Sequence, residues 1–89
     1  MKEFRYVIGI KNGLHARPAG MLVTLAKTFE SDIKLFANGK EANCKRILSV
    51  MSLGVKCGTE VCFQISGIDE KKAESALVQH CKESLSNGE

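Results

Sequence analysis

The sequence is poor in aromatic residues, with no tryptophan, one tyrosine and four phenylalanines. Domains of the α/β-sandwich type that bind RNA stack bases on aromatic side chains of an open sheet face. Four of the five aromatic residues fall at positions that we predict to face the core: Phe4, Tyr6, Phe29 and Phe63. The net charge of +3 is also mild. We therefore expect no binding of nucleic acid.

Long apolar runs and metal-ligand spacings are lacking too. No stretch approaches the roughly 20 apolar residues that cross a bilayer, and the N-terminus enters a strand-like pattern without the apolar segment of a signal peptide. The cysteines contain no C-x-x-C pair and have no histidine at ligand spacing; they are Cys44, Cys57, Cys62 and Cys81. We expect reduced thiols, no metal site, no membrane insertion and a soluble, cytoplasmic protein.

The 89 residues, 44% of them hydrophobic, suit one domain spanning 1–89. Alternation of apolar and polar residues predicts four strands, at 3–10, 33–37, 40–43 and 60–66. Apolar residues at helical spacing predict three helices, at 16–29, 46–53 and 69–85. Asp69 is predicted to cap the last helix, and the tail 86–89 to fray. The order β-α-β-β-α-β-α predicts an α+β two-layer sandwich with the helices on one face of the sheet.

The stretch Gly13–Gly20 carries the chemistry. If the first helix begins at Ala16, then His15 stands at its N-terminus, where free backbone N–H groups and the helix dipole favour a phosphate. Histidine can act as a nucleophile that forms a covalent intermediate, and Arg17 can neutralise a phosphate beside it. Pro18 is tolerated in a first turn but predicts an irregular start. The alternative from these residues alone is a surface histidine without a catalytic role.

Two motifs resemble one known family. The run GLHARPA at 13–19 is similar to the active-site signature of HPr, the histidine-containing phosphocarrier of the bacterial phosphotransferase system. The run ILSVMSLG at 47–54 resembles the short second helix of that family, and the spacing agrees over essentially the whole chain. The resemblance implies an open-faced β-sandwich with four antiparallel strands in the order 1-4-2-3.

The resemblance also implies a reaction. Enzyme I, charged by phosphoenolpyruvate, would phosphorylate the δ nitrogen of His15, and the carrier would pass the group to enzyme IIA components that feed sugar uptake. Arg17 would stabilise the phosphohistidine, and the backbone amides of Ala16 and Arg17 would contact the phosphate. Such a carrier needs no metal or organic cofactor and is an intermediate in phosphotransfer rather than a stand-alone enzyme. We expect it to be a monomer.

The family's docking patch maps onto Gly20 and three apolar residues of the second helix, Ile47, Leu48 and Met51. The alternative is that these residues only pack on the sheet. Three basic residues, Lys27, Lys45 and Arg46, are predicted to surround this patch and to steer acidic partners, with ordinary solvation as the alternative. His80 matches no motif and is interpreted as structural.

One position departs from the family. Many Gram-positive members carry a regulatory serine just before the second helix, and this chain has Arg46 there. Arginine has no hydroxyl to phosphorylate, so we expect that control to be absent. Two other roles remain open at this point: a carrier in the nitrogen-linked phosphorelay, and an HPr-like binding module that regulates partners without passing phosphate onward.

Overall fold

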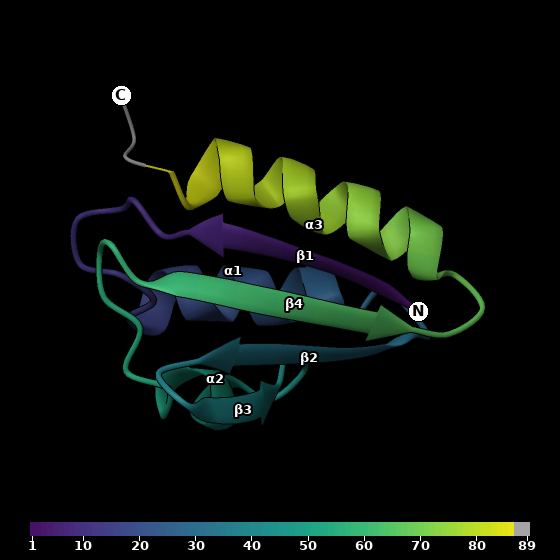
Figure 1. The fold of residues 1–89 in the computed structure, drawn as a ribbon, viewed down its shortest axis with the longest axis horizontal. Helices are drawn as coiled ribbons and strands as arrows, with labels where there is room; N and C mark the ends of the chain where they lie inside the picture. Colours follow the sequence, from purple (N-terminus) through teal and green to yellow (C-terminus); the bar gives the residue numbers. More distant parts are fainter. Residues whose placement is uncertain (87–89) are drawn as a thin grey trace.

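An antiparallel sheet of four strands forms one layer of the fold and three helices form the other (Figure 1). The computed structural model describes residues 1–86. The strands are β1 (Lys2–Val7), β2 (Asp32–Ala37), β3 (Lys40–Asn43) and β4 (Glu60–Ser66), in the spatial order β1-β4-β2-β3. The helices are α1 (Ala16–Ala26), α2 (Ile47–Met51) and α3 (Glu70–Ser84). The predicted fold class and strand order are confirmed.

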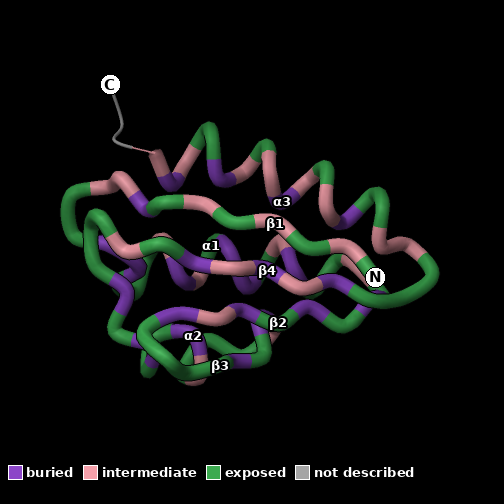
Figure 2. The backbone as a smooth tube through the Cα atoms, in the orientation of Figure 1, coloured by how far each residue is buried: buried purple, intermediate pink, exposed green. Residues whose placement is uncertain are grey.

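The core lies between the sheet and the helices, because each strand turns alternate side chains toward the helix layer. Along β2, Ile33 and Leu35 are buried whereas Asp32 and Lys34 are exposed. In Figure 2, buried residues alternate with intermediate ones along the middle of β4, and intermediate residues alternate with exposed ones along β1. The rings of Phe4 and Phe63 stack across neighbouring strands, with their centroids 4.7 Å apart. The alternation that predicted strands from the sequence therefore also assigns the sheet face that the helices cover.

The turn between β2 and β3 has the conformation that its two residues predict. Asn38 and Gly39 have φ values of 53° and 76°, and two consecutive positive φ angles are typical of a tight hairpin turn that suits the twist of its strands. The side-chain amide of Asn38 also donates to the carbonyl oxygen of Leu53, at 2.8 Å. The hairpin is thereby attached to the segment that follows α2.

Some element boundaries differ from those predicted. The expected irregular start of α1 is wrong, because Ala16, Arg17 and Pro18 are all helical. Pro18 is in the first turn, where its missing N–H would have no acceptor within the helix. At the other end, α1 stops at Ala26, and Phe29 lies half-buried in the turn that follows.

The apolar spacing of the last helix predicts an inward stripe of Ala73, Ala76, Leu77, His80 or Cys81, and Leu85. The buried stripe of α3 is narrower than this. It consists of Ala73, Leu77 and Cys81, followed by Leu85 just after the helix, whereas Ala76 is only partly buried. The predicted fraying of 86–89 concerns mostly residues outside the described part of the chain. No helix within residues 1–86 is both long and apolar enough to cross a membrane.

Asp69 occupies the predicted N-cap position of α3, but the prediction that its side chain caps this helix is wrong. Its carboxylate instead accepts hydrogen bonds from the backbone N–H of Glu30, at 2.9 Å, and from both the N–H and the hydroxyl of Ser31. Ser31 is almost completely buried. These bonds hold the pKa of the Asp69 carboxyl below its ordinary value, the Ser31 hydroxyl contributing most. Asp69 thus ties the start of α3 to the turn after α1.

Replacing Ser31 with alanine should lower the midpoint of thermal unfolding by roughly 4–8 °C, because the partly buried hydrogen bond from its hydroxyl to the Asp69 carboxylate is lost. The folded chain lowers the pKa of Asp69, so this stabilisation is present above the pKa of an unfolded aspartate, about 3.9, and is lost as the pH falls through the folded value. The difference between wild type and Ser31→Ala should therefore shrink in acid. Thermal melts from pH 3 to pH 7 test this, with the exposed Ser75→Ala as control. A difference that stays constant with pH would contradict it.

Candidate functional site

His15 stands at the N-cap of α1, with an extended backbone (φ −82°, ψ −170°). Its side chain is exposed and makes no capping hydrogen bond, so the imidazole is free to react. The backbone N–H of Ala19 donates to the His15 carbonyl at 2.9 Å, the first bond of the helix. The predicted placement of His15 is confirmed.

The loop before His15 packs against the segment after α2. The side chain of Leu14 is buried in the core, and its N–H donates to the carbonyl of Val55 at 3.0 Å. Gly13 has a φ of 66° and packs against the same segment, where an added Cβ would lie 2.2 Å from the Val55 oxygen. Only glycine fits this close approach in a left-handed conformation. The segment after α2 therefore sets the position of the histidine.

Backbone donors are available beside the imidazole. The N–H groups of Ala16 and Arg17 have no acceptor inside a helix that begins at Ala16. The first turn of α1 also contains no acidic residue that could compete for them. Within residues 1–86, Arg17 is exposed and forms no ion pair, so its guanidinium is free to approach a bound anion. This arrangement suits a phosphate on His15.

Two hollows flank the site. One, of about 370 Å³, lies between the loop before α1 and the end of α3 and is lined by His15, Pro18, Lys11 and Ser84 among others. The second, of about 680 Å³, runs along α1 past Gly20 and Thr24. Arg17, Met21 and His80 line both hollows, so these three side chains form the wall between them.

Met21 and His80 were missed as site residues in the sequence. Met21 is 50% exposed, and it falls outside the buried stripe of α1, which was a usable signal. His80 had no such signal, because only the packing of α3 beside α1 brings it to His15. Its Nε2 atom is buried, and no residue in the described part of the chain forms a hydrogen bond with it. Burial of the ring lowers the pKa of His80, an effect that the nearby Glu83 carboxylate opposes.

The predicted docking residues lie together on the helix layer. An added Cβ on Gly20 would be 3.6 Å from the Cδ1 atom of Ile47, which shows that α1 and α2 are neighbours here. Leu48 is 79% exposed, and Ile47 and Met51 are exposed to a lesser degree, whereas Val50 is completely buried. The helix thus divides its apolar residues between the core and the surface.

The three predicted basic residues differ in their surroundings. Lys45 donates from Nζ to the carbonyl oxygen of Phe29 at 2.7 Å, which holds the amine close to the backbone. Arg46 is the N-cap residue of α2 and is exposed, as is Lys27 at the end of α1. Neither forms an ion pair with any described residue. Lys27 and Arg46 are therefore the freer of the three cations.

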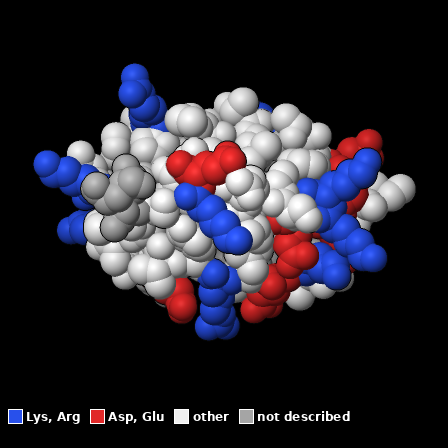
Figure 3. Space-filling view, turned by 90° about the horizontal axis from the view of Figure 1, so that it is seen from above, with Lys and Arg blue, Asp and Glu red and all other residues white. Residues whose placement is uncertain are grey.

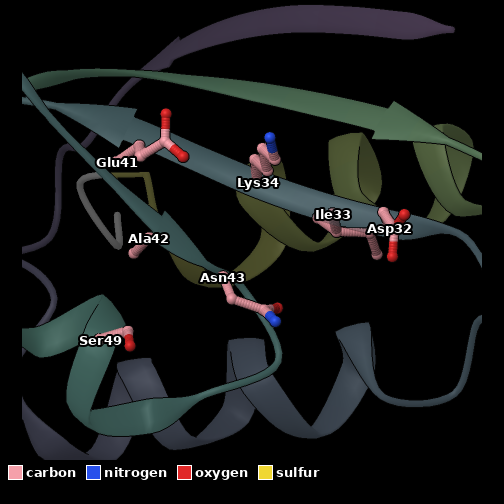
Figure 4. A pocket seen from close by; sticks show the side chains of 7 residues that line it. All are labelled: Asp32, Ile33, Lys34, Glu41, Ala42, Asn43 and Ser49. Atoms are coloured by element: carbon pink, nitrogen blue, oxygen red, sulfur yellow. The ribbon is translucent and has the colours of Figure 1, made fainter.

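Another hollow, of about 220 Å³, lies beside β2, β3 and α2. Its polar side chains include Asp32, Lys34, Glu41 and Ser49, and Figure 4 shows that they come from different elements and do not converge on one point. In the described part of the chain, no group of three or more His, Cys, Asp or Glu residues could hold a metal ion.

The thiols are free, as predicted. Burial raises the pKa of Cys44 and of Cys81 to about 12, so neither forms a thiolate near neutral pH. Cys57 is exposed, and Cys62 is partly buried in β4, where it pairs with Arg5 and Phe36 of the neighbouring strands. None of the four is in the lining of the two hollows beside His15.

Known proteins share this fold and this sequence pattern. Residues 2–83 match the family described as "PTS HPr component phosphorylation site". The phosphocarrier protein HPr of Mycoplasma capricolum is 43% identical over 79 residues, which are 89% of each chain. A solved structure of the histidine-containing phosphocarrier of Mycoplasma is 40% identical, with a TM-score of 0.90 over 98% of this chain and 100% of that one. An HPr dimer from Thermoanaerobacter tengcongensis is 40% identical, with a TM-score of 0.75 over 92% and 97% of the two chains.

Proposed function

This chain belongs to the HPr family, the phosphocarriers of sugar uptake by the bacterial phosphotransferase system, and from that membership we propose that His15 is its phosphoryl acceptor. Enzyme I and enzyme IIA proteins are the partners that the family implies. The phosphoryl group moves from enzyme I to a ring nitrogen of His15, where an N–P bond forms as the bond to the donor breaks. Transfer to enzyme IIA reverses these changes.

The observation that carries this proposal is the combination of a free imidazole and free donors at one helix end. The side chain of His15 is exposed and unbonded, and the N–H groups of Ala16 and Arg17 stand next to it without acceptors in the helix. The positive end of the helix dipole stabilises the charge of a phosphate there. Arg17 supplies the charge-assisted hydrogen bonds that hold it.

The test is to incubate the chain with enzyme I and phosphoenolpyruvate and to locate the phosphate. Trypsin separates the two histidines, because His15 falls in the peptide 12–27 and His80 in the peptide 73–82. We expect an acid-labile phosphate on peptide 12–27 that disappears when enzyme IIA is added. A chain that gains no phosphate, or gains it elsewhere, would contradict the proposal, and phosphate retained in the presence of enzyme IIA would favour a regulatory module.

We further propose that partners dock on the docking patch, defined as Gly20, Ile47, Leu48 and Met51. Exposed apolar residues grouped beside a reactive side chain are typical of a partner site. Lys45 and Arg46 directly precede α2 and Lys27 follows α1, and these three cations would favour an acidic partner surface. Because Arg46 stands at the family's regulatory serine position, the rate of loading would depend on phosphoryl supply and demand rather than on a serine kinase.

Replacing Leu48 with alanine should raise the KM of enzyme I for the carrier by about tenfold, the effect of losing about 1.4 kcal/mol of contact energy. The fold should be unaffected, because Leu48 is 79% exposed. The matched control is Ile68→Ala, an apolar residue that is 90% exposed in the loop between β4 and α3. That loop lies at the opposite end of the sheet from the loop that leads into α1 (Figure 1). Equal KM values for the two variants would contradict docking at Leu48.

We also propose that the chain works as a cytoplasmic monomer that does not bind nucleic acid. The net charge is only +3, and on the face seen in Figure 3 basic and acidic side chains are interspersed rather than separated. That face offers no continuous basic stripe for a phosphate backbone. The relative from Thermoanaerobacter tengcongensis forms a dimer, so the mass in solution, measured by light scattering, tests the monomer directly.

A further inference from the structure

His80 lines both hollows that flank the phosphoryl site, although no motif in the sequence points to it. With Arg17 and Met21 it forms the wall between them, and it shares the smaller hollow with His15. That hollow measures about 370 Å³, whereas one water molecule occupies about 30 Å³ of liquid. A phosphoryl group on His15 therefore has room to enter the space that His80 borders.

The surroundings of His80 favour a neutral ring in the unloaded chain. The ring is partly buried, and its Nε2 atom has no hydrogen-bond partner among residues 1–86. An imidazolium carries two N–H donors, so a buried and unpaired nitrogen makes protonation costly. Burial accordingly lowers the pKa of His80, with Glu83 opposing that effect.

The charged groups around His80 come from several elements. Arg17 of α1 and Lys11 of the preceding loop line the same hollow as His80. Glu83 of α3 favours a positive charge on the ring. On β1, Lys2 and Tyr6 are titratable residues of the helix-facing side, and Tyr6 packs against the core. Among residues 1–86, the cations named around His80 therefore outnumber the one carboxylate, Glu83.

A phosphoryl group reverses this balance, because it brings a charge of about −1.5 to −2 into the hollow. We infer that His80, together with Arg17, is a binding group for the phosphoryl group on His15, and that its contribution depends on pH. When His15 is loaded, the neutral ring of His80 takes up a proton from solvent. The resulting imidazolium joins Arg17 in balancing the charge of the phosphate. This inference rests on the proposed function of His15. By linkage, phosphate on His15 favours the proton on His80, and that proton favours the phosphate equally.

The first experiment follows the titration of His80 by NMR in the full chain labelled with ¹⁵N-histidine. The two imidazoles are assigned with the variants His15→Asn and His80→Gln. We expect the titration midpoint of His80 to move to higher pH once enzyme I and phosphoenolpyruvate have loaded His15. A loaded chain in which this midpoint stays in place or moves down overturns the inference but leaves the proposed function intact. A chain that never loads overturns both.

The second experiment compares wild type with His80→Gln, whose side chain is polar but does not titrate. The fraction of carrier loaded at equilibrium with phosphorylated enzyme I is measured at pH 6 and pH 8. The pH dependence of enzyme I cancels in the ratio of the two proteins. At pH 6 we expect the loading equilibrium to favour wild type by about twofold to fivefold, the range for a partly screened charge pair, and at pH 8 this advantage should vanish. A ratio independent of pH indicates a merely structural role and overturns the inference.

Discussion

A His15→Asn variant is expected to accept no phosphoryl group from enzyme I, while folding as wild type does. The amide nitrogen of asparagine is not a nucleophile, so the N–P bond cannot form. Asparagine is also among the best N-cap residues, and the exposed side chain of His15 makes no capping bond that the variant would lose. The free energy of unfolding should therefore change by less than about 0.5 kcal/mol. Phosphate transfer from enzyme I measures the loss of acceptance, and a denaturant melt measures the free energy of unfolding.

The same variant separates loss of chemistry from loss of docking. The docking patch is untouched by the substitution, so His15→Asn should compete with wild type for enzyme I and slow the loading of wild type. Loss of acceptance together with loss of competition would indicate that the variant no longer binds enzyme I. Label on peptide 73–82 would instead mean that His80 is the acceptor, and the assignment of His15 would be wrong.

Of the substitutions predicted here, Gly13→Ala should produce the largest loss of stability. Gly13 has a φ of 66°, and a methyl group there would lie 2.2 Å from the oxygen of Val55 and 2.6 Å from the Cα of Lys56. The left-handed backbone and the forced displacement of a packed segment together should cost about 2–4 kcal/mol. For a domain of this size we expect a fall of roughly 10–25 °C in the thermal midpoint. Phosphoryl acceptance should fall too, because the Leu14–Val55 bond next to Gly13 positions His15.

Gly54→Ala is the matched control for this prediction. Gly54 has nearly the same φ, 65°, but an added Cβ would meet nothing within 4 Å. Gly54→Ala should therefore lower the free energy of unfolding only by the cost of a left-handed backbone at alanine, about 1–2 kcal/mol. The difference between the stability losses of Gly13→Ala and Gly54→Ala measures the energetic cost of the steric clash between the loop before α1 and the segment after α2. Equal losses of stability would show that this approach carries no cost.

Much of the fold could be predicted from local sequence. Alternation in 33–37 and 60–66 specified strands, and the Asn38-Gly39 pair specified the hairpin, because both signals act between residues close in the chain. The boundaries were less accurate, as at Pro18 and Phe29, since the final turn of a helix depends on what packs against it. Asp69 shows the same limit: its carboxylate bonds the turn at Glu30 and Ser31 instead of its own helix.

The site divides in the same way. The sequence by itself determined that His15 stands at a helix start with Arg17 beside it, because both residues lie within one turn of the chain. Only the tertiary structure decided that Val55 holds the loop before His15, that Ile47 lies against Gly20, and that His80 borders the hollow at His15. These contacts join residues distant in sequence, and they form only when the helices pack together on the sheet.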